Sequence, residues 1–177
     1  MIKRLSLALT FPIVCAGCYS QTPSSATKKY LIEHGTMEYK MNDGTSKYYF
    51  TDYGNKFREE FFDNSGALTH EEVYNGEVYY SIQGNSIDTL GKINNPYFKS
   101  ADPQGHKKNR QYKILGEVKT IASQPCQGFE YYNSVIAEMI TIYGWNNIVM
   151  QQSRDGIVDI EAVKFDPQRP TVSFELK

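Results

Sequence analysis

The sequence has few of the residues on which many functional classes depend. It contains three cysteines, one tryptophan and three histidines in 177 residues, and its formal net charge is only −1. The histidines, His34, His70 and His106, are 36 residues apart, whereas zinc motifs need closely spaced ligands. A nearly neutral chain also lacks the positive field that attracts nucleic acid. The sequence therefore predicts no metal site and no nucleic-acid partner.

Motifs of catalysis and cofactor binding are absent as well. No nucleophile elbow, P-loop or dinucleotide-binding fingerprint occurs. The adjacent acidic pairs Glu59-Glu60 and Glu71-Glu72 lie on predicted strands, so the two members of each pair point to opposite faces. Cross-strand ion pairing, with Arg58 for example, is the simpler interpretation. We predict no catalytic residue, no cofactor and a protein that is not an enzyme.

The chain also has no long hydrophobic run at its start. The apolar stretch Leu5–Val14 covers ten residues, whereas a membrane-spanning helix needs about 20. Lys3 and Arg4 precede this stretch, and the small residues Ala16 and Gly17 follow it. A charged start, a short apolar region and small residues are typical of a secretory signal. An ordinary signal peptide or a short membrane-anchored N-terminus would account for the same pattern.

The segment that ends in Ala16-Gly17-Cys18 resembles the lipobox of bacterial lipoproteins, although Cys15 stands where that family usually has leucine. The resemblance implies that residues 1–17 are removed as a signal peptide and that Cys18 is lipidated, as by palmitate. Each buried methylene of an acyl chain contributes about 0.8 kcal/mol, so two or more chains hold a domain at a bilayer. Residues 18–30, rich in serine and threonine, would then form the lipidated cysteine and its flexible tether.

The location that this resemblance implies is the bacterial cell envelope. Lys3 and Arg4 leave with the signal, which makes the mature chain more negative by two charges. No acidic residue closely follows Cys18, and this favours an anchor in the outer membrane that faces the periplasm. Cys126 remains as an unpaired cysteine. It could be a free thiol, form an intermolecular bridge or act as a buried small hydrophobe, which is the commonest outcome.

Residues 31–177 have the pattern of a single antiparallel β domain. Aromatic residues make up 14% of the chain, which favours strands. Turn signals such as Asn75-Gly76 and Asp155-Gly156 recur about every ten residues, which leaves no room for crossover helices. The predicted strands are Thr36–Met41, Lys47–Tyr53, Lys56–Phe62, Leu68–Tyr74, Glu77–Gln83, Ile114–Ala122, Gly128–Asn133, Ala137–Tyr143, Trp145–Gln152, Val158–Phe165 and Val172–Leu176.

Residues 92–111 interrupt this pattern. A short helix is expected between Pro96 and Ala101, and the basic cluster His106–Arg110 is interpreted as a solvated loop. A single sheet of so many strands tends to curl. The predicted fold is therefore mainly β: a strongly curved antiparallel sheet, or incomplete barrel, with one or two short helices.

Two stretches resemble envelope lipoproteins whose domain is similar to the Lol-type lipoprotein carriers: Glu33–Met41 followed by Lys47–Glu60, and Ile121–Glu130 followed by Tyr143–Val149. Cys126 near a strand end and Trp145 before the apolar pair Ile148-Val149 carry this resemblance. It implies an incomplete barrel that holds hydrophobic material on its concave side. It assigns no ligand-binding residue.

The sequence thus leads to two functional hypotheses. In the first, an anchored envelope lipoprotein binds a hydrophobic or lipid-like ligand in the concave face of a half-barrel lined with Tyr and Phe. In the alternative, the aromatic residues fill the core and the protein is a non-catalytic accessory or structural subunit of an envelope complex. The only partners predicted are the membrane, through the acyl anchor, and a possible hydrophobic ligand.

Overall fold

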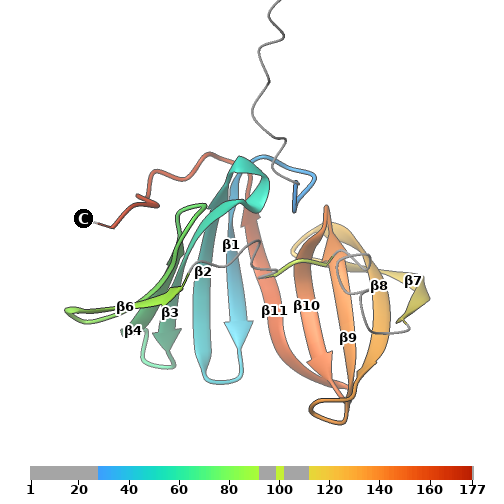
Figure 1. Cartoon of the computed structure of the whole chain (residues 1–177). Helices are drawn as coiled ribbons and strands as arrows, with labels where there is room; N and C mark the ends of the chain where they lie inside the picture. The colour runs from blue at the N-terminus through green and yellow to red at the C-terminus, as the bar shows by residue number, and fades with distance from the viewer. Residues whose placement is uncertain (1–27, 92–98, 102–111, 177) are drawn as a thin grey trace, which may run out of the picture.

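The computed structural model describes residues 28–91, 99–101 and 112–176, which form one antiparallel sheet of eleven strands (Figure 1). The order across the sheet is β6-β5-β4-β3-β2-β1-β11-β10-β9-β8-β7. The strands are β1 (Gly35–Met41), β2 (Gly44–Thr51), β3 (Lys56–Asp63), β4 (Leu68–Tyr74), β5 (Tyr79–Gln83), β6 (Ser86–Gly91), β7 (Tyr112–Ile121), β8 (Gln124–Asn133), β9 (Glu138–Trp145), β10 (Ile148–Arg154) and β11 (Ile157–Asp166).

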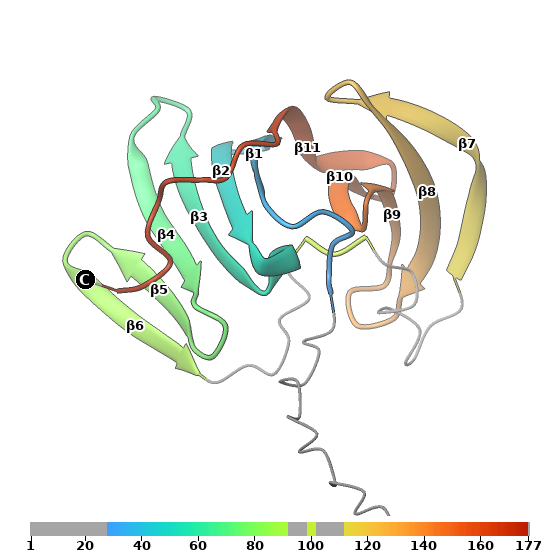
Figure 2. The same ribbon diagram turned by 90° about the horizontal axis from the view of Figure 1, so that it is seen from above.

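This order combines two meanders that meet at one long-range pairing. Each strand pairs with its neighbour in the chain, except that β1 also pairs with β11 and so brings the two ends of the domain to the centre of the sheet. β6 and β7, which are consecutive in the chain, become the two outer edges. Figure 2 shows that the sheet bends into an open arch between them. The prediction of a mainly β, strongly curved and incomplete barrel is confirmed.

Several hairpins form where the sequence supplies residues that tolerate positive φ. Asp155 and Gly156 have φ values of 46° and 82° between β10 and β11, as the type I′ signal predicted. Asn146 and Asn147 have φ values of 49° and 64° between β9 and β10. The strand predicted over Trp145–Gln152 is therefore broken near its start, because two asparagines also support a tight turn.

Two other strand predictions need correction. The segment Val172–Leu176 forms no strand: both edges of β11, the strand before it in the chain, already pair with β1 and β10, and the segment instead lies beside β3. Ser86–Gly91, which was not predicted, forms the edge strand β6. Its only partner in the sheet is β5, and its side chains are mostly exposed, so it shows little hydrophobic alternation.

Helical structure is minimal in the described residues. The one helical element there is the 3-10 turn η1 (Asp52–Gly54). The short helix expected between Pro96 and Ala101 falls mostly outside the described residues, and Ser100 forms an isolated antiparallel bridge with Ile148. No helix in the described parts of the chain is long and apolar enough to cross a membrane. Cys18 and the basic cluster His106–Arg110 lie outside the described residues.

Candidate functional site

The most distinctive surface of the fold is a layer of aromatic side chains on one face of β1–β5. Strand alternation places every second residue on this face, and the register aligns them across the sheet. Phe50 lies opposite Phe57, which lies opposite Tyr74, and Tyr74 lies opposite Tyr79. We call this set, together with Tyr39 and Tyr48, the aromatic layer. All six side chains are buried.

The rings of the aromatic layer are in contact. The Phe57 centroid lies 5.4 Å from that of Tyr48, 5.9 Å from that of Tyr74 and 6.0 Å from that of Tyr79. These separations are those of favourable aromatic pairs. The ring contacts are therefore continuous over the strands from β2 to β5, and Tyr39 of β1 belongs to the same buried cluster.

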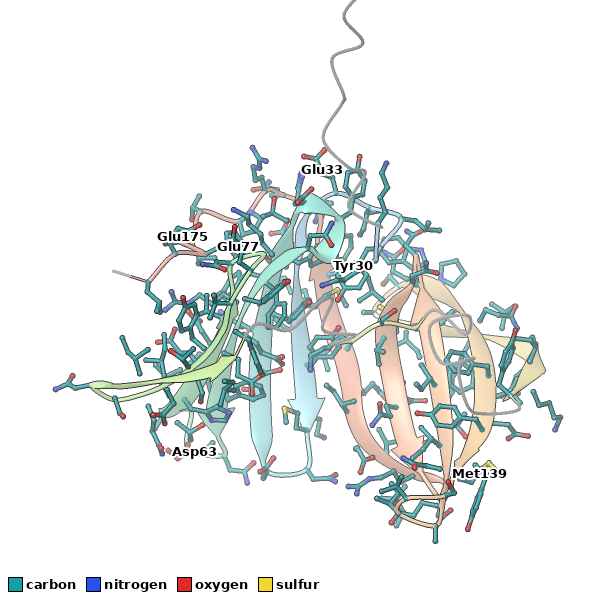
Figure 3. The ribbon with its side chains drawn as sticks, in the orientation of Figure 1. Tyr30, Glu33, Asp63, Glu77, Met139 and Glu175 are labelled. Carbon is teal, nitrogen blue, oxygen red and sulfur yellow. The ribbon has the colours of Figure 1, made fainter. Side chains whose placement is uncertain are left out.

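The N-terminal described segment, residues 28–33, covers part of this layer. Because the segment lies inside the arch of the sheet, the aromatic layer is on the concave face. Tyr30 is completely buried, with its ring centroid 5.0 Å from that of Phe50. Its backbone N–H donates to the Tyr53 carbonyl at 3.0 Å, and the Leu31 N–H donates to the Asn146 carbonyl at 3.0 Å. The segment thus joins η1 to the β9–β10 turn across the arch (Figures 2 and 3). Tyr30 stands at the end of the range assigned to the tether.

Residues 99–101 form a second cover near the centre of the sheet. The Val149 N–H donates to the Lys99 carbonyl at 2.8 Å, and the Ala101 N–H donates to the Asn147 carbonyl at 2.8 Å. Gly144 permits this approach, because a Cβ atom at that position would lie 2.2 Å from the Ala101 Cβ. The segment therefore needs a glycine beneath it.

A buried ion pair lies within the aromatic layer. Glu59 follows the alternation of β3 onto the concave face, and its side chain is 4% exposed. The Lys99 ammonium lies 2.9 Å from Glu59 Oε1, and Ser46 Oγ donates to the same oxygen at 2.6 Å. Lys99 also lies 4.6 Å from the ring centroid of Tyr39. A carboxylate at this depth needs such compensation, because its burial without a partner would be strongly unfavourable.

A second lysine reaches the same layer from the N-terminal segment. Lys29 Nζ lies 5.0 Å from the Tyr74 ring centroid, and within the described residues it has no hydrogen-bond partner. Burial lowers the pKa of Lys29 to about 8, partly offset by the charge of Asp52. Both segments that cross the arch therefore place an ammonium group over a tyrosine ring, the geometry of a cation–π interaction.

The tyrosine hydroxyls of the layer are held in buried hydrogen bonds. The Tyr30 and Tyr48 hydroxyl oxygens lie 2.8 Å apart. Burial raises the pKa of both phenols and of Tyr39 well above the ordinary value, so these groups stay neutral. The neutral phenols can act as hydrogen-bond partners but supply no ionised base.

The opposite face of β3–β6 carries a separate groove of about 500 Å³ beneath the C-terminal segment. Arg58 pairs there with Glu71 of the neighbouring strand β4, as cross-strand pairing predicted, and also with Glu60 of its own strand. It donates to the Ser173 carbonyl at 3.4 Å. Because opposite charges already pair within it, this groove is less suited to an apolar ligand than the aromatic layer.

The residues that carried the family resemblance occupy structural positions. Cys126, Ile148 and Val149 are buried in the core, and Trp145 packs edge-on against Phe165 with centroids 5.0 Å apart. Burial raises the pKa of the Cys126 thiol. This places Cys126 among the buried small hydrophobes considered from the sequence.

Other chemistry-bearing residues are not brought together. His70 on β4 stacks on Phe61 of β3, whereas Cys126 lies on β8, seven strands away from β4 in the order of the sheet. Within the ranges that the structure describes, no group of three potential metal ligands occurs. The acidic pairs point to opposite faces as predicted: Glu59 lies in the aromatic layer and Glu60 beside Arg58.

Glu59, Lys99 and Tyr30 were not predicted as candidate site residues. Glu59 had a detectable signal, since it is a charged residue between Phe57 and Phe61 on the same face of a strand. Lys99 and Tyr30 lie in segments without regular patterning, and only the path of the folded chain brings them to the layer.

Comparisons with known proteins support the fold alone. No family model matches the chain, and no curated protein matches its sequence. An uncharacterised conserved protein from Thermus thermophilus has a similar structure, with a TM-score of 0.53 and 11% identity over 83% of this chain and 85% of that one. MucB has a TM-score of 0.46 and 13% identity over 83% of this chain and 57% of its own. The fold class is that of an open, curved antiparallel sheet, and the Thermus protein has a similar fold.

Proposed function

We propose that this protein is a non-catalytic lipoprotein of the bacterial envelope. Acyl chains on Cys18 would anchor it to the outer membrane on the periplasmic side. The concave face of its half-barrel would bind a hydrophobic or lipid-like ligand. The anchor rests on the lipobox resemblance and the ligand on the aromatic layer.

The observation that carries the ligand proposal is the nature of the cover over the aromatic layer. In the part of the chain that the structure describes, that cover consists of the short irregular segments 28–33 and 99–101. Segments with few backbone hydrogen bonds open at lower free-energy cost than packed helices or strands. An acyl chain that displaced such a segment would find contiguous rings, the usual lining of sites for apolar ligands.

Ligand binding can be tested on the full-length protein extracted in mild detergent. Native mass spectrometry should detect a copurifying hydrophobic molecule, and an uncharged fluorescent fatty-alcohol probe should compete with it. Phe57→Leu, which keeps an apolar side chain within the layer, should weaken probe binding several-fold. Leu68→Ala, an exposed position, serves as the control. A folded protein that never binds the probe would refute the proposal.

The anchor requires its own experiment. Radiolabelled palmitate should enter the wild-type chain and the Cys15→Ser variant but not the Cys18→Ser variant. Unlabelled wild-type protein with an unprocessed N-terminus would refute the lipoprotein proposal while leaving the ligand proposal open to its own test.

A second function, that of an accessory subunit, is favoured by exposed apolar side chains at one end of the sheet. Val135 is 83% exposed and Ile157 is 68% exposed. Val135 lies in the β8–β9 hairpin and Ile157 in the β10–β11 hairpin. A hydrogen bond joins the two hairpins, because the Met139 N–H donates to Asp155 Oδ1 at 2.9 Å. Figure 3 shows Met139 at the end of the sheet opposite Glu33. Chemical crosslinking in cells should capture a partner that Val135→Asp loses, and an unchanged crosslinking pattern would count against this function.

A further inference from the structure

We propose that Glu59, Ser46 and the rings of Tyr39 and Tyr48 form a binding site for a primary ammonium group, which Lys99 fills within this chain. The ligand of the concave face would then be an amphiphile with a primary amine at its polar end. This inference rests on the proposed function and deepens it by naming the chemical class of the head group.

The geometry around Lys99 contains the elements by which proteins recognise ammonium groups. The ammonium nitrogen lies 2.9 Å from Glu59 Oε1, 4.6 Å from the Tyr39 ring centroid and 5.9 Å from that of Tyr48. The carboxylate accepts a charge-assisted hydrogen bond, and the ring faces attract the remaining positive charge. Ser46 fixes the carboxylate by donating to the same oxygen at 2.6 Å.

The burial of these groups makes the site selective for a cation. The side chains of Glu59 and Lys99 are 4% and 14% exposed. A carboxylate so far from water must be matched by a positive charge, and a carboxylate or phosphate ligand would be repelled. A primary amine is preferred over a quaternary one because its N–H groups can donate to the Glu59 carboxylate.

The position of the site suits an amphiphile. Glu59 lies between Phe57 and Phe61 along the concave side of β3, so an amine bound there would leave its alkyl chain against the aromatic layer. Lys29, from a different part of the chain, places its own ammonium 5.0 Å from the Tyr74 ring centroid. The ring alone does not offset the burial of that ammonium, because the pKa of Lys29 falls to about 8, so the Glu59 carboxylate is what distinguishes the site filled by Lys99.

Chemical rescue tests the ammonium site directly in the full-length protein. Lys99→Ala leaves the Glu59 carboxylate without its cation and should lower the melting temperature by roughly 5–10 °C. Butylamine at millimolar concentrations should restore part of that loss, whereas butanol and butyrate should not. The double variant Lys99→Ala/Glu59→Gln should show no rescue. Lys164→Ala, which removes a surface pair with Glu38, is the matched control and should respond to none of the three compounds.

Ligand selectivity provides a measurement that does not depend on the stability of Lys99→Ala. Wild-type protein should bind decylamine more tightly than decanol, decanoate or decyltrimethylammonium. Glu59→Gln should reduce decylamine binding to the level of decanol. Removal of Lys99 should strengthen decylamine binding about tenfold, because a tethered competitor is lost.

The outcomes separate this inference from the proposed function. Equal binding of decylamine and decanol, or rescue by butanol as effective as by butylamine, would overturn the ammonium site and leave a hydrophobic ligand possible. Failure of all four decyl compounds to bind would refute the proposed function. Rescue by butylamine would then still support the ammonium site itself.

Discussion

Tyr39 on β1 donates a 2.8 Å hydrogen bond from its hydroxyl to the Val149 carbonyl oxygen on β10, past the intervening strand β11. Strands two apart in a flat sheet are separated by nearly 10 Å. The phenol spans this gap on the concave side, where curvature brings the strands together. A β-bulge between Val149 and Gln151 lies next to the acceptor, and such bulges increase local bending.

Tyr39→Phe should therefore destabilise the domain by about 1–2 kcal/mol, because a buried carbonyl oxygen loses its hydrogen-bond donor. Urea unfolding followed by circular dichroism measures the change in the free energy of unfolding. Tyr132→Phe is the matched control, since Tyr132 is exposed, and it should have almost no effect. Equal stabilities for the two variants would mean that the hydrogen bond contributes nothing.

The contact between Tyr30 and Gly54 leads to a second prediction. Gly54 has φ +82°, and a Cβ atom there would lie 2.6 Å from the Tyr30 ring. Gly66 has φ +83° but no atom within 4 Å of a Cβ. Gly66→Ala should cost about 1 kcal/mol through backbone strain alone. Gly54→Ala should cost clearly more, because the Tyr30 segment must also move.

Differential scanning calorimetry of the two glycine variants would measure this difference. Limited proteolysis supplies a second measurement, since Gly54→Ala should speed cleavage near Tyr30 and Gly66→Ala should not. A melting temperature that is the same in both variants would show that Tyr30 does not pack tightly against η1.

The strands of this fold were largely predictable, whereas the pairing that shapes it was not. Alternation along Lys56–Phe62 and turns such as Asp155-Gly156 are local signals, and both are found in the structure. The pairing of β1 with β11 joins Thr36 to Asp166, and no local pattern specifies a contact of that range.

The candidate site was predictable only as a type of surface. The surplus of Tyr and Phe indicated an aromatic concave face, but the same residues also suited a filled core. Glu59 was visible as a charge on a mixed face, but its partner Lys99 lies outside the regular strands. The ion pair depends on the route of the chain across the arch, and this route is a property of tertiary structure.

The buried thiol of Cys126 gives a third prediction. Its side chain is completely buried, its Sγ lies 3.3 Å from the Gln124 carbonyl oxygen, and burial raises its pKa. Because only the thiolate reacts readily, a thiol-specific reagent at pH 8 should label Cys126 very slowly in the folded protein and quickly in urea. The Cys15→Ser/Cys126→Ser variant identifies any labelling elsewhere. Rapid labelling of native Cys126 would contradict its assignment to the core.

The fourth prediction concerns alkaline pH and Lys29, whose pKa falls from 10.5 to about 8 on folding. Below pH 8 the lysine is charged in both states, and folding carries the full cost of burying it. Between pH 8 and 10.5 the unfolded chain binds more protons than the folded one, so this lysine makes stability rise with pH. The free energy of unfolding should therefore rise by about 2 kcal/mol between pH 8 and 10.5, after allowance for the solvent that still screens the amine.

Comparison with Lys29→Met isolates this contribution, because other groups act in the opposite direction. The pKa values of Cys126, Tyr39 and Tyr48 are raised in the folded protein, so these groups make stability fall once the unfolded chain loses their protons. Urea midpoints from pH 7 to 11 should show that Lys29→Met is more stable than wild type at pH 7 and that the difference shrinks toward pH 10.5. A constant difference across this range would mean that Lys29 titrates normally, and that the Tyr74 ring and its surroundings do not desolvate the amine.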